Sequence, residues 1–223
     1  KISKNNPNPL VQENKLLNKF LIITIRESVQ KYLLENFNVK SLFMYHPFYE
    51  FKIPDDEGLN YKCVSIARLD FDKNTDIILK ANKLMKNEKN HIYLFGSENR
   101  IYVYHKLKEL NVENYWKGKF PKNLSPTYEN KNILKNAKYM IDLSIIKNDG
   151  GGTQYTFLEA IYHNTILILH NDWILKGNLF KSGYNCIGVS NENELSEFLE
   201  NDLSTDKYNQ ILNNSKKILK NHI

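Results

Sequence analysis

Residues 139–170, YMIDLSIIKNDGGGTQYTFLEAIYHNTILILH, decide the fold of this chain. Their two ends, 139–144 and 165–170, are apolar runs typical of buried strands. Between them lie a polar loop with three consecutive glycines and, over 153–163, a pattern typical of a helix. A strand, a loop, a helix and a second strand in this order predict two parallel strands joined by a right-handed crossover.

The same alternation continues on both sides of this stretch. The sequence predicts further strands at 20–25, 41–48, 62–67, 91–96, 112–118 and 185–189. It predicts helices at 27–37, 74–86, 101–110, 125–137 and 192–201, a short helix after residue 170, and a final helix beginning near Thr205. Repeated alternation of this kind predicts the α/β class, with a doubly wound, parallel, Rossmann-like sheet and helices on both faces.

A boundary between two parts of the chain is expected near residue 50. The stretch EFKIPDDEGLN, residues 50–60, is polar and rich in turn-forming residues, and it separates the regular pattern from the segment before it. The sequence therefore predicts a first part at 1–50 and a Rossmann-like part at 51–223.

Composition excludes several classes of protein. No apolar run reaches the roughly 20 residues that cross a membrane. The two cysteines, Cys63 and Cys186, lie in apolar runs, which predicts reduced core residues and a cytoplasmic location. No Cys/His cluster has the spacing of a zinc site, so no metal centre is expected.

The chain carries a formal net charge of +6, which fits either a lysine-rich, solvated surface or an anionic partner. Nucleotide phosphate and nucleic acid both fit that charge. The lysines are scattered along the chain and form no dense basic block, and this favours a nucleotide.

The glycine loop has the composition of an anion-binding site. In a doubly wound sheet, ligands bind at the carboxyl ends of the strands, and Gly150, Gly151 and Gly152 follow one such end. Glycine lets a ligand approach the backbone closely, and the amides and dipole of the following helix favour phosphate. The pattern is neither a Walker loop nor GxGxxG, and a flexible surface turn is the alternative.

Three charged side chains are expected near the same edge of the sheet. Arg68 and Lys73 follow the strand at 62–67, and a guanidinium fork with an ammonium suits a diphosphate. Glu159 lies about two turns into the helix, where it can accept hydrogen bonds from ligand hydroxyls, as acidic residues do with ribose. The alternatives are two solvated charges in a loop and a solvent-facing glutamate.

In order and spacing, these segments resemble the group 1 family of retaining glycosyltransferases, which have the GT-B fold. The resemblance rests on Arg68 and Lys73 in ARLDFDKNTDIILKANKL, on the strand IYLFG ending at Gly96, on YWKG, on MIDLS, and on LEA after the glycine loop. It covers residues 61–200. Residues 20–48 resemble the last strand–helix–strand unit before the junction of the two lobes.

The resemblance implies an enzyme. The chain would be the C-terminal, nucleotide-sugar-binding lobe, at 51–223, ending in a helix that crosses back. Residues 1–50 would be the tail of the first, acceptor lobe, the rest of which is expected to be absent from this chain. The reaction would transfer a hexose, with retention, from a nucleotide diphosphate sugar to a glycan, lipid, protein or DNA acceptor, without metal or another cofactor.

The resemblance also implies roles for single residues. Arg68 and Lys73 would hold the diphosphate, Glu159 the ribose, and the segment from Trp116 to Lys119 would lie near the base. The implied substrate-binding residues are Arg68, Lys73, Gly96, Lys117, Gly118, Gly151, Gly152, Thr153, Gln154, Tyr155, Thr156 and Glu159.

One position departs from the family pattern. The family has a glutamate that contacts the donor sugar eight positions before the second glutamate, and here that position is Gly151. Asp149 is the nearest acid and is expected to reach in from the loop. The candidate catalytic carboxylates are therefore Asp149 and Glu159, with Glu159 binding hydroxyls rather than acting as a general base.

Three alternatives remain open from the sequence. The DFD at 70–72 has the spacing of a carboxylate pair that holds a divalent ion, although an acid is also expected there as a helix cap. The chain could be a nucleotide-binding or interaction module without catalysis. A DNA-modifying glucosyltransferase of related fold is also compatible with the positive charge.

Overall fold

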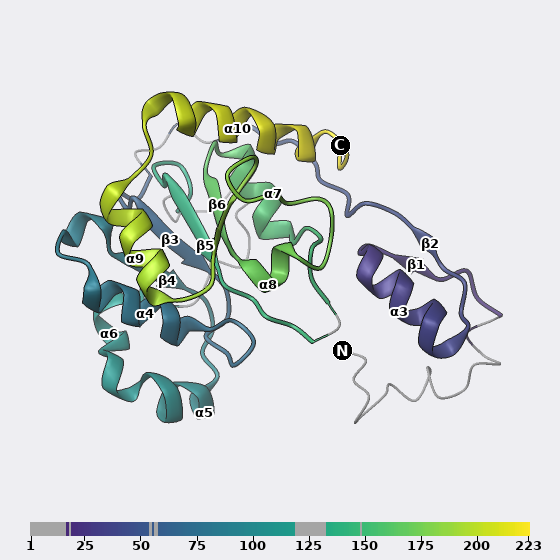
Figure 1. The fold of residues 1–223 in the computed structure, drawn as a ribbon, viewed down its shortest axis with the longest axis horizontal. Helices are drawn as coiled ribbons and strands as arrows, with labels where there is room; N and C mark the ends of the chain where they lie inside the picture. Colours follow the sequence, from purple (N-terminus) through teal and green to yellow (C-terminus); the bar gives the residue numbers. More distant parts are fainter. Residues whose placement is uncertain (1–16, 18, 54, 56–57, 119–132, 148) are drawn as a thin grey trace.

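The protein is described here by a computed structural model of residues 17, 19–53, 55, 58–118, 133–147 and 149–223. Its centre is a sheet of five parallel strands in the order β4-β3-β5-β6-β7 (Figure 1). The chain runs from β3 to β4 on one side and then crosses to β5 on the other side of β3, so the sheet is doubly wound, as predicted. The strands are β3 (Cys63–Ile66), β4 (Ile92–Phe95), β5 (Tyr139–Asp142), β6 (Ile166–His170) and β7 (Ile187–Val189).

Helices cover both faces of this sheet and enclose two cores. α4 and α9 pack together on one face, and α7 packs with α10 on the other (Figure 1). Because successive strand residues point to opposite faces, Ile166 and Ile168 of β6 enter the first core, and Leu167 and Leu169 the second. The helices are α4 (Thr75–Leu84), α7 (Tyr155–Tyr162), α8 (Asn171–Ile174), α9 (Glu192–Asn201) and α10 (Thr205–Leu219).

The short strand predicted within 112–118 is reduced to one parallel bridge. A short helix, α6 (Val112–Tyr115), begins that segment, and only Trp116 pairs with β4, through a single bridge to Leu94. Val112, Tyr115 and Trp116 are spaced as i, i+3 and i+4 and all pack against the core beside α4. That spacing is the period of a helix, and it outweighed the apolar and aromatic content that had suggested a strand.

The helix predicted at 101–110 is irregular. It begins as α5 (Arg100–Tyr102), continues as a π-helical turn over Val103–Leu107 and ends as a 3-10 turn over Lys108–Leu110. The helix predicted at 125–137 falls mostly outside the described residues. The short helix expected after residue 170 is α8, and the final helix begins at Thr205 as predicted.

An N-terminal unit lies beside the main sheet (Figure 1). It is a parallel strand pair, β1 (Ile23–Thr24) and β2 (Leu42–Phe43), joined by α3 (Glu27–Phe37). The strands are much shorter than those predicted at 20–25 and 41–48, whereas the helix has the predicted bounds.

The end of the chain ties this unit to the main sheet. The Phe48 amide donates to the His222 carbonyl at 2.8 Å, and the ring of His222 bonds the His46 carbonyl at 2.6 Å through Nδ1. The residues after α10 therefore hold the segment that leads from the N-terminal unit into the Rossmann-like part.

Two further expectations concern the cysteines and membrane-spanning segments. Cys63 and Cys186 are free and buried, and burial raises the pKa of each thiol to about 12. In the part of the chain that the structure describes, no helix combines the length and apolar character needed to cross a membrane.

Candidate functional site

A hollow of ≈ 310 Å³ opens where the carboxyl ends of β3 and β4 meet the start of α7. We call it the sheet-edge hollow. The strand order reverses between β3 and β5, and ligands of doubly wound sheets bind at such a reversal. Its lining residues are Ile66, Ala67, Arg68, Lys73, Phe95, Gly96, Ser97, Gln154 and Thr156.

Lys73 holds the floor of the sheet-edge hollow together. Its ammonium lies 2.6 Å from Ser144 Oγ, 3.3 Å from Asp142 Oδ2 and 3.3 Å from Gln154 Oε1. An ammonium has three protons to donate, so these partners account for all of them. The Asp142 side chain is 1% exposed, and Lys73 is its compensating charge. Lys73 therefore joins the start of α4 to the end of β5 and the start of α7.

Arg68 is the more accessible cation of the pair. Its side chain is 56% exposed and lies 3.3 Å from Asp70 Oδ2 and 3.9 Å from Asp72 Oδ1. Asp70 is held in turn by the Asn99 amide, which donates to Oδ1 at 2.9 Å. Both carboxylates of the DFD thus face a guanidinium. Among the described residues, no three His, Cys, Asp or Glu side chains gather as a metal site would require.

Gly96 allows two strand ends to approach each other. A Cβ atom at this position would lie 1.9 Å from the Ala67 carbonyl oxygen, which no side chain tolerates. The Gly96 amide donates to the Gly118 carbonyl at 3.0 Å, and Trp116 Nε1 donates to the Gly96 carbonyl at 3.0 Å. The structure therefore brings Gly96, Lys117 and Gly118 together beside the sheet-edge hollow. Residue 119 lies outside the described residues.

Glu159 is a buried carboxyl group on α7. The residue is 5% exposed, and burial raises its pKa to about 8. Within the described residues no side-chain hydrogen bond or ion pair engages it; only its backbone carbonyl is bonded, by His163. At neutral pH most of the unliganded protein carries Glu159 in its neutral form.

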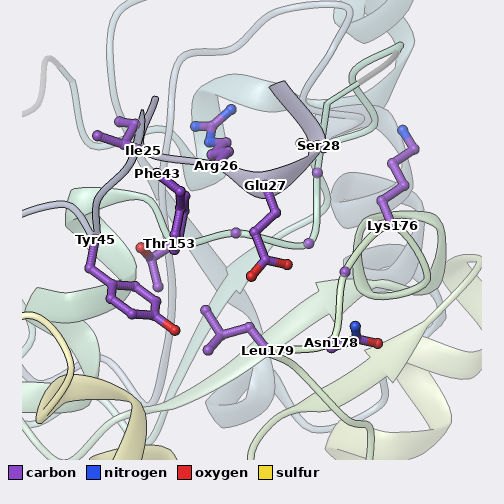
Figure 2. A pocket seen from close by; sticks show the side chains of 14 residues that line it. Ile25, Arg26, Glu27, Ser28, Phe43, Tyr45, Thr153, Lys176, Asn178 and Leu179 are labelled. Atoms are coloured by element: carbon purple, nitrogen blue, oxygen red, sulfur yellow. The ribbon is translucent and has the colours of Figure 1, made fainter. Parts of the chain in front are cut away.

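A second hollow, of ≈ 150 Å³, is lined in part by the glycine loop (Figure 2). We call it the junction hollow, because the N-terminal unit forms one wall and the glycine loop with the segment after α8 forms the other. Its lining residues are Ile25, Arg26, Glu27, Ser28, Phe43, Tyr45, Gly150, Gly151, Gly152, Thr153, Lys176, Gly177, Asn178 and Leu179.

Gly151 packs too closely against the segment after α8 to carry a side chain. It has φ +71, and a Cβ atom there would lie 2.4 Å from the backbone nitrogen of Gly177. Neither the backbone angle nor the space admits a side chain. The glutamate that the family pattern has at this position cannot be accommodated here.

Asp149 is turned toward the N-terminal unit. Its carboxylate pairs with the Arg26 guanidinium and accepts from Ser28 Oγ at 3.3 Å. The Arg26 guanidinium also lies over the Trp173 ring, 5.2 Å from its centroid. These contacts anchor the glycine loop to the start of α3, and the catalytic role predicted for Asp149 stays a prediction.

The structure divides part of the predicted site between the two hollows, and neither lining includes Lys117, Gly118, Asp149, Tyr155 or Glu159. Arg68, Lys73, Gly96, Gln154 and Thr156 line the sheet-edge hollow, whereas Gly151, Gly152 and Thr153 line the junction hollow. Thr153 Oγ1 also lies 3.5 Å from His222 Nε2, and the Tyr155 ring packs against His46 at 5.5 Å.

Sequence reasoning missed the contribution of the N-terminal unit. Arg26 and Glu27 directly follow β1, as Arg68 follows β3, and the same rule about strand ends could have identified them. Gly177 left no such signal, because its importance comes from contact with Gly151.

No family model matches this chain, and no curated protein matches it by sequence. Solved structures do resemble it. HepE (Alr3699) of Anabaena in complex with UDP and glucose has a TM-score of 0.71 at 17% identity, over 96% of this chain and 62% of that one. A glycosyltransferase of Rickettsia africae ESF-5 has a TM-score of 0.68 at 15% identity, over 99% and 64%.

The pneumococcal O-GlcNAc transferase GtfA, in complex with UDP and GlcNAc, has a TM-score of 0.63 at 14% identity, over 99% of this chain and 47% of that one. The chain thus spans less than two thirds of the length of each of these three proteins. The likeness confirms the predicted fold class, a Rossmann-like lobe of the kind found in GT-B glycosyltransferases.

Proposed function

We propose that this chain is the donor-binding part of a glycosyltransferase, of the hexosyltransferase type, that uses a nucleoside diphosphate sugar. The observation that carries the proposal is the sheet-edge hollow, where Arg68 and Lys73 lie beside the first turn of α7. HepE with UDP and glucose, and GtfA with UDP and GlcNAc, are similar in fold and support it.

We assign the base, ribose, diphosphate and sugar of the donor to successive groups of residues along the sheet-edge hollow. The base lies near Gly96, Lys117 and Gly118, and the ribose hydroxyls face Glu159. The diphosphate meets Arg68 and the amides of the first turn of α7, which have no partners within their own helix. The sugar then extends past Thr153 toward the glycine loop.

Catalysis on this lobe is assigned to stabilisation of the leaving group. The bond between the anomeric carbon and the β-phosphate oxygen breaks as a bond forms between that carbon and an acceptor oxygen, and the acceptor proton passes to the leaving diphosphate. Arg68 and the α7 amides are the donors where negative charge develops, and Lys73, whose protons are held by protein partners, adds only its positive charge. We propose that they replace a metal ion. Retention of configuration at the anomeric carbon is part of the proposal.

The acceptor is assigned to the other lobe, of which residues 1–50 would be the tail. We propose a glycan, lipid, protein or DNA acceptor and a cytoplasmic location. The alternative, a nucleotide-binding module without catalysis, is favoured by one observation, since Gly151 has no room for the glutamate of the family pattern. Turnover of a nucleotide sugar separates the two.

Calorimetric titration with UDP and GDP tests the proposal. Arg68→Ala should weaken binding of the preferred nucleotide roughly tenfold or more, because a charge-assisted hydrogen bond is lost. Arg100→Ala is the matched control, since Arg100 is 92% exposed and pairs only loosely with Glu98, at 3.8 Å. Equal affinities in wild type, Arg68→Ala and Arg100→Ala would contradict the assignment of the site.

A further inference from the structure

Two consecutive residues line the two hollows: Thr153 lines the junction hollow, and Gln154 lines the sheet-edge hollow. Under the proposed function the diphosphate lies at Arg68 and the sugar extends past Thr153, so the sugar is assigned to the junction hollow. This assignment rests on the proposed function.

The glycine wall of the junction hollow offers backbone and no carboxylate. Gly151 cannot carry a side chain, because a Cβ atom would overlap the backbone of Gly177. Asp149, the nearest acid in the loop, does not line the hollow, because its carboxylate is bound by Arg26 and Ser28. Neither residue supplies an acceptor for sugar hydroxyls.

The opposite wall, formed by the N-terminal unit, supplies an acceptor in the carboxylate of Glu27. Glu27 lines the hollow and is exposed, and Figure 2 shows its side chain pointing down from the start of α3, with the carboxylate above Leu179 in this view. Within the described part of the chain, the Glu27 carboxylate takes part in no ion pair and accepts no hydrogen bond. Its neighbour Arg26 is anchored to Asp149 and over Trp173, and this anchorage holds the backbone of Glu27 above the hollow.

The rest of the lining suits a sugar. Tyr45, Thr153 and Asn178 offer neutral polar groups, and Phe43 and Leu179 offer apolar surface. Small-molecule sites combine apolar walls with a few placed polar groups in this way. The charge of Lys176 is directed elsewhere, because its ammonium donates to the carbonyls of Ile146, at 2.6 Å, and Asp149, at 3.0 Å.

We propose that Glu27 determines donor-sugar specificity by accepting hydrogen bonds from sugar hydroxyls, in place of the side chain that Gly151 lacks. An ionised carboxylate only accepts, and a hydroxyl can donate to it, so a neutral hexose is favoured. A uronic acid would bring a second negative charge against Glu27 and is disfavoured.

The test compares nucleotide sugars with their parent nucleotides on the full chain. Calorimetry with UDP, GDP and a panel of their hexose conjugates, UDP-glucose included, identifies the best-bound nucleotide sugar. In Glu27→Ala its affinity should fall roughly tenfold, because a charge-assisted acceptor is lost, while UDP or GDP stays within about twofold. Glu27→Gln should fall less, because the amide oxygen still accepts.

A matched control lies on the same helix. Glu35 is exposed and pairs with Lys31 at 3.7 Å, so Glu35→Ala should change neither affinity. UDP-glucuronate should bind wild type no more tightly than UDP, and Glu27→Gln should remove that penalty. Equal losses for nucleotide and nucleotide sugar in Glu27→Ala, or an unchanged preference for the sugar conjugate, would overturn the role of Glu27.

The two proposals fail in different ways. If wild type binds neither UDP nor GDP, the proposed function fails and the role of Glu27 falls with it. If wild type binds a nucleotide normally but no hexose conjugate binds more tightly than its parent nucleotide, only the sugar subsite at the junction hollow is refuted.

Discussion

The sheet-edge hollow and the junction hollow are built in different ways. The sheet-edge hollow belongs wholly to the Rossmann-like part, and its floor is held by the buried contacts of Lys73. The junction hollow has one wall from the N-terminal unit, joined to the other by the pair of Arg26 and Asp149. The first is fixed by the core of one unit, and the second depends on how two units meet.

The difference separates two tasks. A diphosphate looks the same in every nucleotide sugar, so its site can be part of a rigid sheet edge. Sugars differ in the arrangement of their hydroxyls, and the wall that we propose to face the sugar comes from a separate unit. We expect changes in the sheet-edge hollow to alter stability and nucleotide affinity, and changes in the junction hollow to alter the response to the sugar.

The largest effect on stability is expected from Lys73→Met. The substitution leaves the buried Asp142 carboxylate without its ion pair, and breaking a buried pair in this way costs about 3–5 kcal/mol. Urea denaturation measures the loss. Lys117→Met is the control, since Lys117 is exposed and stacks on Tyr93, and it should cost less than about 1 kcal/mol. Similar losses in both variants would mean that the sheet-edge hollow is not held by its buried pair.

Gly151→Ala, at the junction hollow, is expected to cause a smaller loss of folding stability than Lys73→Met. The added methyl group would meet the backbone of Gly177, and overpacking of this kind costs about 1–3 kcal/mol beyond the strain of a positive φ. Gly183→Ala is the control, because Gly183 has nearly the same angle, φ +74, with nothing within 4 Å of the added atom.

The difference between the two glycine variants isolates the contact with Gly177. Gly151→Ala should leave UDP or GDP affinity within about twofold, because Gly151 does not line the sheet-edge hollow. A larger change would require the loss of a hydrogen bond to the nucleotide. A large loss of nucleotide affinity would show that the two hollows act as one site and would remove the contrast between them.

The smallest effect is a pH dependence at Glu159. Burial raises its pKa to about 8, and hydrogen bonds from ribose hydroxyls stabilise the ionised form. Binding therefore releases a proton, and affinity for the preferred nucleotide should rise with pH up to about 8 and level off above it, with a total gain of about 1.4 kcal/mol for each unit by which the ligand lowers the pKa. Glu159→Gln should show no such rise, and a parallel pH profile in both proteins would contradict the ribose contact.

The same group contributes to stability with a defined sign. Its folded pKa, about 8, lies above the unfolded value of about 4.3, so the folded state holds the proton more tightly. The stability due to Glu159 is therefore fully present below about pH 4.3, falls as the pH rises, and is lost above about pH 8. The difference in unfolding free energy between wild type and Glu159→Gln, followed across this range, measures the effect.

Much of the fold followed from the sequence. The alternation of buried strands and amphipathic helices predicted the parallel sheet, and α3, α9 and the start of α10 lie where the pattern placed them. Within 112–118 the structure has a short helix followed by a single bridge to β4, because a short run of apolar and aromatic residues fits a strand as well as a turn of helix. Only contact with the core beside α4 decided between them.

For the site, the sequence determined which residues sit at strand ends, because parallel strands bring their carboxyl ends to one edge of the sheet. That rule grouped Arg68 and Lys73 with the glycine loop at one edge, whereas the structure places them with Gln154 around one hollow and the glycines around another. The tertiary structure alone decided that Asp149 pairs with Arg26, 123 positions away, and that Gly151 packs against Gly177. Contacts between distant segments depend on tertiary packing, and no local pattern of residues encodes that geometry.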